Sequence, residues 1–168
     1  MSLNIRLEKH SDIETINNVT VAAFLNAQHT DHTEQFIVKG LRNKGALTIS
    51  LVAEDENKII GHVALSQVTI SDGSNDWYGL GPISVMPDEQ GKGIGSKLMD
   101  VAVAELKKLN AKGCVLLGDP NYYHRFGFAP VDNLILADVP PEYFQALLLQ
   151  GSYPKGNVTY HESFLAQG

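Results

Sequence analysis

The hydrophobic period of the chain changes twice between residues 77 and 117, and this constrains the fold more than any other feature. Residues 77–85 contain the aromatic and β-branched side chains typical of a strand. One helical face then carries the apolar residues Ile94, Leu98, Val101, Ala102, Leu106 and Leu109. Residues 114–117 form a second apolar strand candidate. A strand, helix and strand in this order predict a crossover, which brings the two strands parallel in one sheet.

The other segments predict an antiparallel meander with flanking helices. Turn-forming residues separate strand candidates at residues 48–54, 59–70 and 77–85. Helical patterns cover Asp12 to about Ala27 and a stretch with Phe36, Ile37 and Leu41 that ends at Gly45. Residues 4–7, a short helix at Pro141–Leu149 and a last strand near Asn157–His161 complete the prediction. We expect an α+β fold of α/β/α layers, with helices on both faces of a single mixed, mostly antiparallel sheet.

Composition limits the classes of function. The 168 residues fit a single domain, residues 1–168. The net charge of −6 disfavours nucleic-acid binding, which needs clustered Lys and Arg. We expect a cytoplasmic protein, because the chain has a single cysteine, Cys114, and no secretory pattern at the N-terminus. We expect no membrane segment, because the chain lacks a long apolar run. His29 and His32 have no third ligand nearby, so no metal site is expected.

A glycine-rich loop joins the strand at 77–85 to the following helix and predicts an anion site. Gly91, Gly93 and Gly95 permit a close approach of the backbone, and the helix start supplies free N–H groups with Lys92 beside them. The loop fits neither a Walker A motif nor a dinucleotide fingerprint. The alternative is a tight turn whose glycines only relieve strain.

Two motifs resemble the signatures of the GNAT family of N-acetyltransferases. Residues 90–95, Gln-Gly-Lys-Gly-Ile-Gly, match its Gln/Arg-x-x-Gly-x-Gly/Ala loop. Residues 118–128 resemble a second signature, in which a Tyr stands four residues before Gly-Phe, and a bacterial subgroup of predicted acetyltransferases carries a similar segment. The resemblance extends from Asn4 to about Tyr160. It implies the GNAT acyl-CoA N-acyltransferase fold, whose parallel strand pair splays apart, with a strand bulge for which Gly79 and Gly81 are suitable.

The resemblance implies acetyl-CoA as cosubstrate. The loop N–H groups would bind the pyrophosphate, and the strand before the loop would pair with the pantetheine arm like an added strand. The cofactor-binding residues implied are Ile83, Ser84, Val85, Gln90, Gly91, Lys92, Gly93, Ile94, Gly95, Ser96 and Asn121.

By the same resemblance, Tyr123 is the general acid that protonates the departing thiolate, and the backbone N–H of Val85 stabilises the oxyanion. Tyr122 is the alternative acid, and aromatic packing is the alternative role for both tyrosines. The general base stays open among Asp119, His124 and water, because residues 77–86 contain no carboxylate.

The function implied is acetyl transfer from acetyl-CoA to a primary amine of a small molecule or peptide by direct attack in a ternary complex. The alternative is a non-catalytic acyl-CoA-binding or regulatory module of the same fold. In the family, acceptor contacts come from segments that correspond here to residues 24–36 and 137–155. A homodimer is possible, and Phe144, Leu147 and Leu148 are the apolar residues that could pack on the sheet or form its contact.

Overall fold

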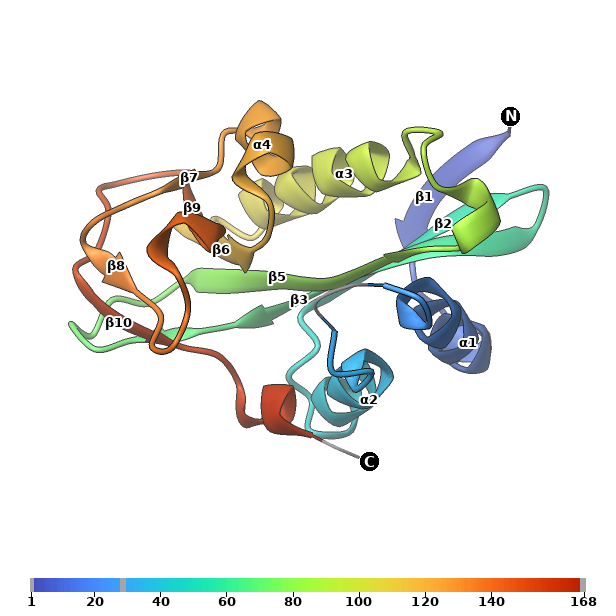
Figure 1. Ribbon diagram of the computed structural model, residues 1–168, viewed down its shortest axis with the longest axis horizontal. Coiled ribbons are helices and arrows are strands. Elements are labelled where there is room, and N and C mark those ends of the chain that lie inside the picture. Colours follow the sequence, from blue (N-terminus) through green and yellow to red (C-terminus); the bar gives the residue numbers. More distant parts are fainter. Residues whose placement is uncertain (1, 28–29, 167–168) are drawn as a thin grey trace.

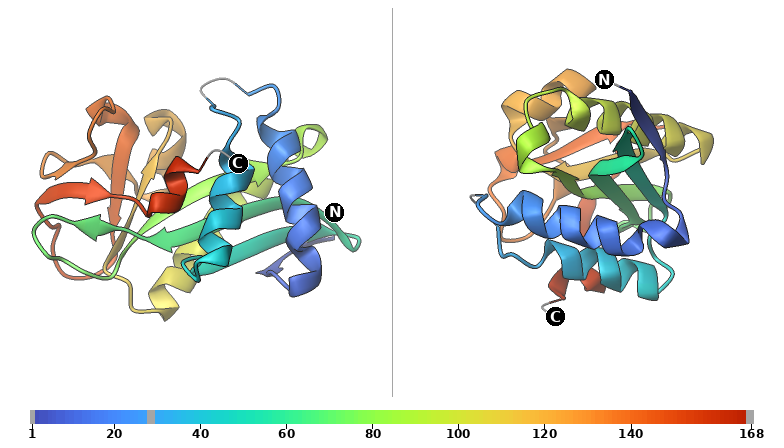
Figure 2. Two further views of the ribbon diagram at one scale, coloured as in Figure 1. Left: turned by 90° about the horizontal axis from the view of Figure 1, so that it is seen from below. Right: turned by 90° about the vertical axis from the view of Figure 1, so that its right-hand side faces the viewer.

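The computed structural model describes residues 2–27 and 30–166, in which helices cover both faces of a mixed sheet. The seven strands of this sheet follow the order β1-β2-β3-β5-β6-β9-β7. Helices α3 and α4 lie on one face, and α1 and α2 lie on the other (Figures 1 and 2). The predicted α+β architecture is confirmed.

The bounds of the elements follow the sequence prediction over most of the chain. The helices are α1 (Ile13–Phe24), α2 (Glu34–Asn43), α3 (Ile94–Lys108) and α4 (Pro120–Tyr123). The strands are β1 (Leu3–Leu7), β2 (Ile49–Asp55), β3 (Lys58–Gln67), β4 (Thr69–Ile70), β5 (Trp77–Val85), β6 (Gly113–Leu117), β7 (Ala129–Pro130), β8 (Leu134–Ile135), β9 (Phe144–Leu148) and β10 (Gly156–Thr159).

The predicted crossover is confirmed, and its two strands separate soon after they meet. Strand β5 pairs in parallel with β6 only from Trp77 to Gly79, opposite Gly113 to Val115. Strand β5 nevertheless continues to Val85 along β3, its antiparallel neighbour. The last residues of β5 therefore have a strand on one side only, which leaves one backbone edge open.

A bulge lies where β5 leaves β6. The register with β3 shifts between the pairs Leu65–Leu80 and Val63–Ile83, so β5 carries one extra residue. Gly81 takes a φ of 142° there, a conformation that favours glycine. Gly79 has a different role from the one predicted, because its missing Cβ makes room for the ring of Tyr160.

The predicted helix at Pro141–Leu149 is wrong. Only Pro141–Tyr143 form a 3-10 turn, and Phe144–Leu148 form strand β9, which pairs antiparallel with β6. Apolar residues three apart in so short a run fit either period, and β6 needs a partner on the side away from β5.

A second correction concerns residues 59–70, which form β3 and the separate strand β4. Strand β4 belongs to a small additional sheet of order β4-β10-β8 that the sequence did not reveal.

Two apolar layers hold the sheet between its helices. Val63, Leu65 and Leu80 pack with Leu98 and other residues of α3 on one face. Val52 and Ala64 pack with residues of α1 and α2, namely Ile16, Val19 and Val38, on the other. Because side chains alternate along a strand, His62 of β3 lies on the same face as Ala64, toward α1 and α2.

His62 is the polar exception within this second layer. Its side chain is 0% exposed, and burial lowers its pKa to about 4, although the nearby Glu8 carboxylate opposes that shift. A lowered pKa means that the folded protein binds fewer protons than the unfolded chain between that value and the ordinary histidine pKa. The stabilising effect of the neutral His62 on the folded state is therefore complete above the ordinary histidine pKa. It decreases as the pH falls from that value toward 4.

We expect the free energy of unfolding to fall by about 3 kcal/mol between pH 7 and pH 4 because of His62. Urea denaturation across this range measures the loss. His62→Gln, which cannot titrate, should have a flatter dependence on pH in the same window. Parallel pH profiles for the two proteins would contradict a buried neutral imidazole.

Candidate active site

The glycine loop turns the chain from β5 into α3 and ends at the helix start. Gly91 and Gly93 have φ angles of 80° and 82°, in the left-handed region that favours glycine. No atom lies within 4 Å of a Cβ placed on either residue, so their backbone conformation explains the glycines. Gly93 is the N-cap of α3. The first N–H groups of this helix and the positive end of its dipole therefore point out of the turn.

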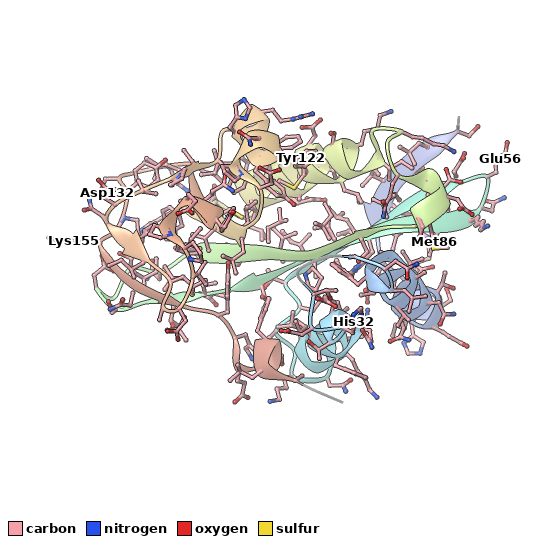
Figure 3. All side chains as sticks on the ribbon, viewed as in Figure 1. His32, Glu56, Met86, Tyr122, Asp132 and Lys155 are labelled. Atoms are coloured by element: carbon pink, nitrogen blue, oxygen red, sulfur yellow. The ribbon has the colours of Figure 1, made fainter. Side chains whose placement is uncertain are left out.

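A cavity of about 340 Å³ lies at this helix start. Of the residues predicted from the sequence to bind cofactor, seven line it: Val85, Gln90, Gly91, Gly93, Ile94, Gly95 and Ser96. Glu89, Tyr122 and Arg125 complete the lining. Figure 3 shows Tyr122 on the α3 side of the sheet, whereas His32 lies on the side of α2. The cavity thus combines helix N–H groups, a guanidinium and an aromatic ring, which suits an anionic ligand with an apolar part.

The structure places the remaining predicted binding residues elsewhere. Lys92 does not line the cavity, and its Nζ pairs with Oε2 of Glu89, a lining residue, at 3.0 Å. Asn121 is exposed on α4, and its N–H donates to Asp119 Oδ1. Ile83 and Ser84 precede Val85 in β5 and are not part of the cavity lining.

Arg125 is the cation that sequence reasoning missed. Its guanidinium carbon lies 4.7 Å from the centre of the Tyr122 ring, and its Nε donates to the Tyr122 carbonyl oxygen at 3.0 Å. Both contacts hold the side chain at the cavity wall. The signal in the sequence was a basic residue three positions after the first tyrosine of the second motif, but only the folded turn brings it to the glycine loop.

The open edge of β5 presents backbone groups beside this cavity. Met86 N–H donates to the Ile60 carbonyl at 2.8 Å, so the alternation of an antiparallel ladder also directs the Ser84 backbone toward β3. The N–H and C=O groups of Ile83 and Val85 then point to the side that β6 has left. Gln90 Nε2 donates to the Val85 carbonyl at 3.1 Å, which fixes the loop against the strand.

The two adjacent tyrosines occupy different places near the open edge. The ring of Tyr123 lies against Gly118, directly after β6, where a Cβ would collide with it. Tyr122 instead reaches the glycine loop, with its hydroxyl 3.4 Å from Ser96 Oγ. The rings meet edge to face at 4.9 Å. Burial, with smaller effects of Tyr122 and Asp119, raises the pKa of Tyr123 to about 12, so its phenol keeps its proton at neutral pH.

The two side chains considered for a general base make local contacts on α4. Asp119 is exposed and caps α4, where it accepts from Asn121 N–H at 2.9 Å. His124 is also exposed, and its Nδ1 lies 3.0 Å from the Asn121 carbonyl oxygen. Neither lines the cavity at the glycine loop.

Within residues 2–27 and 30–166, no three His, Cys, Asp or Glu side chains cluster in a way that could hold a metal ion. His29 lies outside the described residues. In the same ranges, no helix is long and apolar enough to cross a membrane.

Comparisons with known proteins agree with this geometry. Residues 47–130 match the family model described as a GNAT acetyltransferase domain. A protein named uncharacterized N-acetyltransferase YhbS, from Escherichia coli K12, is 35% identical over 109 residues, which are 64% of this chain and 65% of that protein. The aligned region thus spans about two thirds of that curated relative.

Two solved structures resemble nearly the whole chain. A GNAT family acetyltransferase from Brucella melitensis, in complex with acetyl-CoA, is 44% identical with a TM-score of 0.86, covering 96% of this chain and 97% of that one. Escherichia coli YhbS in complex with CoA is 30% identical with a TM-score of 0.88, covering 100% of this chain and 94% of that one.

We expect Arg125→Ala to weaken binding of coenzyme A roughly tenfold, since a hydrogen bond to a charged group contributes about 1.5–3 kcal/mol. Isothermal titration calorimetry with CoA measures the change. Lys58→Ala, which removes the same charge at the exposed β2–β3 turn, is the control and should leave the affinity unchanged. Equal losses in both variants would mean that net charge, and not a contact of Arg125, governs binding.

Proposed function

Because this chain belongs to the GNAT family of acetyltransferases, we propose that it transfers an acetyl group from acetyl-CoA to a primary amine of a small molecule or peptide. A single domain would carry both the cofactor site and the acceptor face. The observation that carries the proposal is the open backbone edge of β5, which lies directly beside the anion-binding start of α3. The fold thus offers adjoining sites for a pyrophosphate and for an amide-containing arm.

We assign the two parts of the cofactor to these sites. The pyrophosphate binds the N–H groups from Gly91 to Ser96, with Arg125 as the nearby cation. The pantetheine arm pairs with the open N–H and C=O groups of Ile83 as an added strand would, which leaves the N–H of Val85 for the thioester carbonyl. Ser84 takes no backbone part in this pairing, because its N–H and C=O face β3.

The chemistry requires an oxyanion donor, an acid, and a base that takes the proton lost by the amine nitrogen. The amine nitrogen attacks the thioester carbon, a C–N bond forms, and the carbonyl oxygen becomes an oxyanion. The Val85 N–H, at the open edge, is the donor for this oxygen. As the C–S bond breaks, Tyr123 donates its phenolic proton to the thiolate and regains one from solvent after the products leave. Attack is direct, so both substrates are bound at once.

The acceptor binds on the face of α1 and α2 in this proposal. The cofactor cavity lies on the α3 face, so the amine reaches the thioester from the opposite side of the sheet. The α1–α2 connection, part of the 24–36 segment predicted to contact the acceptor, lies on that side, and residues 28–29 of it are outside the described residues. Glu34, at the start of α2, has a buried Oε1 without a hydrogen-bond partner among the described residues, which suits a cationic amine.

The apolar residues considered for a dimer contact are used within the fold. Phe144 is 4% exposed, Leu147 packs against the apolar layer on the α3 face, and Leu148 packs in a further apolar cluster that contains Phe144 and Trp77. A homodimer would therefore use another surface.

We place the reaction in the cytoplasm, in keeping with a single buried thiol and no disulfide partner for it.

A non-catalytic acyl-CoA-binding module is the second candidate. The observation in its favour is that residues 77–86, which are β5 and the residue after it, contain no carboxylate that could act as the base. Acetyl-CoA would then bind the same cavity and edge as a regulatory ligand, with no transfer to an amine.

We expect purified protein to release CoA thiol from acetyl-CoA in the presence of amines from a broad panel, and to form the acetylated amine. Thiol titration and mass spectrometry of the products measure this. Tight binding of acetyl-CoA without transfer to any amine would instead support the binding module.

We expect Tyr123→Phe to lower kcat about 100-fold, because a general acid contributes 10²–10⁴-fold. The affinity for acetyl-CoA should stay unchanged, since the phenol acts on the leaving group. Tyr122→Phe is the matched control, with the same atom removed one residue away, and should retain most of kcat. If Tyr122→Phe loses the activity instead, the acid is Tyr122.

A further inference from the structure

A chain of buried polar contacts runs from the middle of β3 to the protein surface. His62 Nε2 lies 2.8 Å from Ser50 Oγ of β2. Ser50 Oγ in turn donates to Glu8 Oε1. Arg42 of α2 holds the same carboxylate, with its Nε 3.1 Å from Oε2 and its NH2 nitrogen 2.8 Å from Oε1. The chain thus ends at Arg42, which lines a surface hollow between α1 and α2.

These contacts fix the tautomer of His62. The Glu8 carboxylate, paired with a guanidinium, only accepts hydrogen bonds. The single hydroxyl proton of Ser50 therefore goes to Glu8, and Ser50 Oγ accepts from the imidazole. His62 must then carry its proton on Nε2. Its Nδ1 keeps a free lone pair, and this buried atom has no hydrogen-bond partner among the described residues.

Ser84 is the cross-strand neighbour of His62. The register of β3 and β5 places Ser84 directly opposite His62, and both side chains lie on the face toward α1 and α2. Ser84 is 2% exposed, and its Oγ is likewise buried without a partner in the described part of the chain. Buried polar atoms are nearly always hydrogen-bonded, so two neighbouring exceptions call for an explanation. The two atoms are not bonded to each other in this structure, so a transfer between them requires Ser84 to turn its Oγ toward Nδ1 by a change of its χ1 rotamer.

The pair is also next to the reaction site. Ser84 lies between Ile83 and Val85, whose backbone groups form the open edge. Its side chain projects to the face opposite the cofactor cavity, from which the amine must approach. No carboxylate stands along β5, and Asp119 and His124 are turned to contacts on α4. Neither of the two side chains considered so far as the base therefore supplies a proton acceptor beside Val85.

We propose that Ser84 and His62 together remove the proton from the attacking amine, an inference that rests on the proposed acetyl transfer. The amine N–H proton passes to Ser84 Oγ as the C–N bond forms, and the Ser84 hydroxyl proton passes to His62 Nδ1. The C–S bond then breaks, and the thiolate takes its proton from Tyr123. After the products leave, His62 returns its proton through Ser84 to solvent, and Tyr123 takes one up, so that no net proton is gained.

The remaining members of the chain position His62 and balance its charge. Glu8 and Ser50 hold Nε2–H, which leaves Nδ1 as the accepting atom. The Glu8 carboxylate also compensates the positive charge of the imidazolium that forms. Burial lowers the pKa of His62, which keeps the imidazole uncharged at neutral pH but also weakens it as a base, and the Glu8 carboxylate partly offsets this shift. Of the charged groups facing this chain, Glu8 favours the imidazolium and Arg42 opposes it.

The first test is a set of serine variants measured by steady-state kinetics with an amine that the wild-type protein acetylates. We expect Ser84→Ala to lower kcat about 100-fold, the lower end of the range for loss of a proton-transfer group, while KM for acetyl-CoA stays unchanged. Ser84→Cys keeps a transferable proton and should retain most of kcat. Ser66→Ala is the matched control. Ser66 of β3 also has a buried hydroxyl without a partner among the described residues, and it lies on the same face of the sheet as His62, on the other side of the bulge.

Each outcome decides the inference. Wild-type kcat in Ser84→Ala, or an equal loss in Ser66→Ala, would overturn it. His62→Gln should lose as much as Ser84→Ala, and the double variant should lose no more than either alone, since both act in one transfer. Additive losses would overturn the proposal.

A second measurement keeps this inference separate from the proposed function. Nitrogen chemical shifts of the His62 imidazole, read by NMR at neutral pH, should show Nε2 protonated and Nδ1 bare. A proton on Nδ1 would overturn the relay whether or not the protein transfers acetyl groups. Failure of the wild-type protein to acetylate any amine would instead contradict the proposed function, with the tautomer still measurable.

Discussion

The parting of β5 from β6 is the constraint on which the rest of the site depends. Parallel pairing ends at Gly79 and Val115, while β3 continues to hold β5 on its other side. The extra residue at Gly81 changes the register at this point. An edge strand within a sheet usually risks unwanted pairing. Here the edge is short, lies inside the molecule and adjoins the start of α3, so it can accept a ligand strand of limited length.

The location of charge explains how an acidic protein can hold a polyanion. The net charge is −6. The cavity at the glycine loop relies on backbone N–H groups and a helix dipole, which do not depend on net charge. Arg125 adds one local cation that stacks on Tyr122. Lys92, the more obvious basic residue in the sequence, is offset by Glu89. Local geometry therefore outweighs the overall balance of charge.

The two faces of the sheet divide the proposed work. The α3 face carries the loop, the cavity and both tyrosines. The face of α1 and α2 carries a buried histidine whose hydrogen bonds reach Glu8 and Arg42 near the surface. Between them, Ile83 and Val85 present backbone groups to the open edge. A substrate pair that reacts across such an edge needs no large domain movement to meet.

The sequence by itself determined the crossover, the glycine loop and the position of Tyr123 before Gly127, because each depends on residues close together in the chain. It also predicted the bounds of β5 and nearly those of α3. It was wrong for Phe144–Leu148, where a short apolar run fits a strand as well as a helix and the need of β6 for a partner decides. Only the tertiary structure brought Arg125 to the loop and set Ser84 opposite His62, since these contacts join segments whose separation in sequence leaves no local pattern.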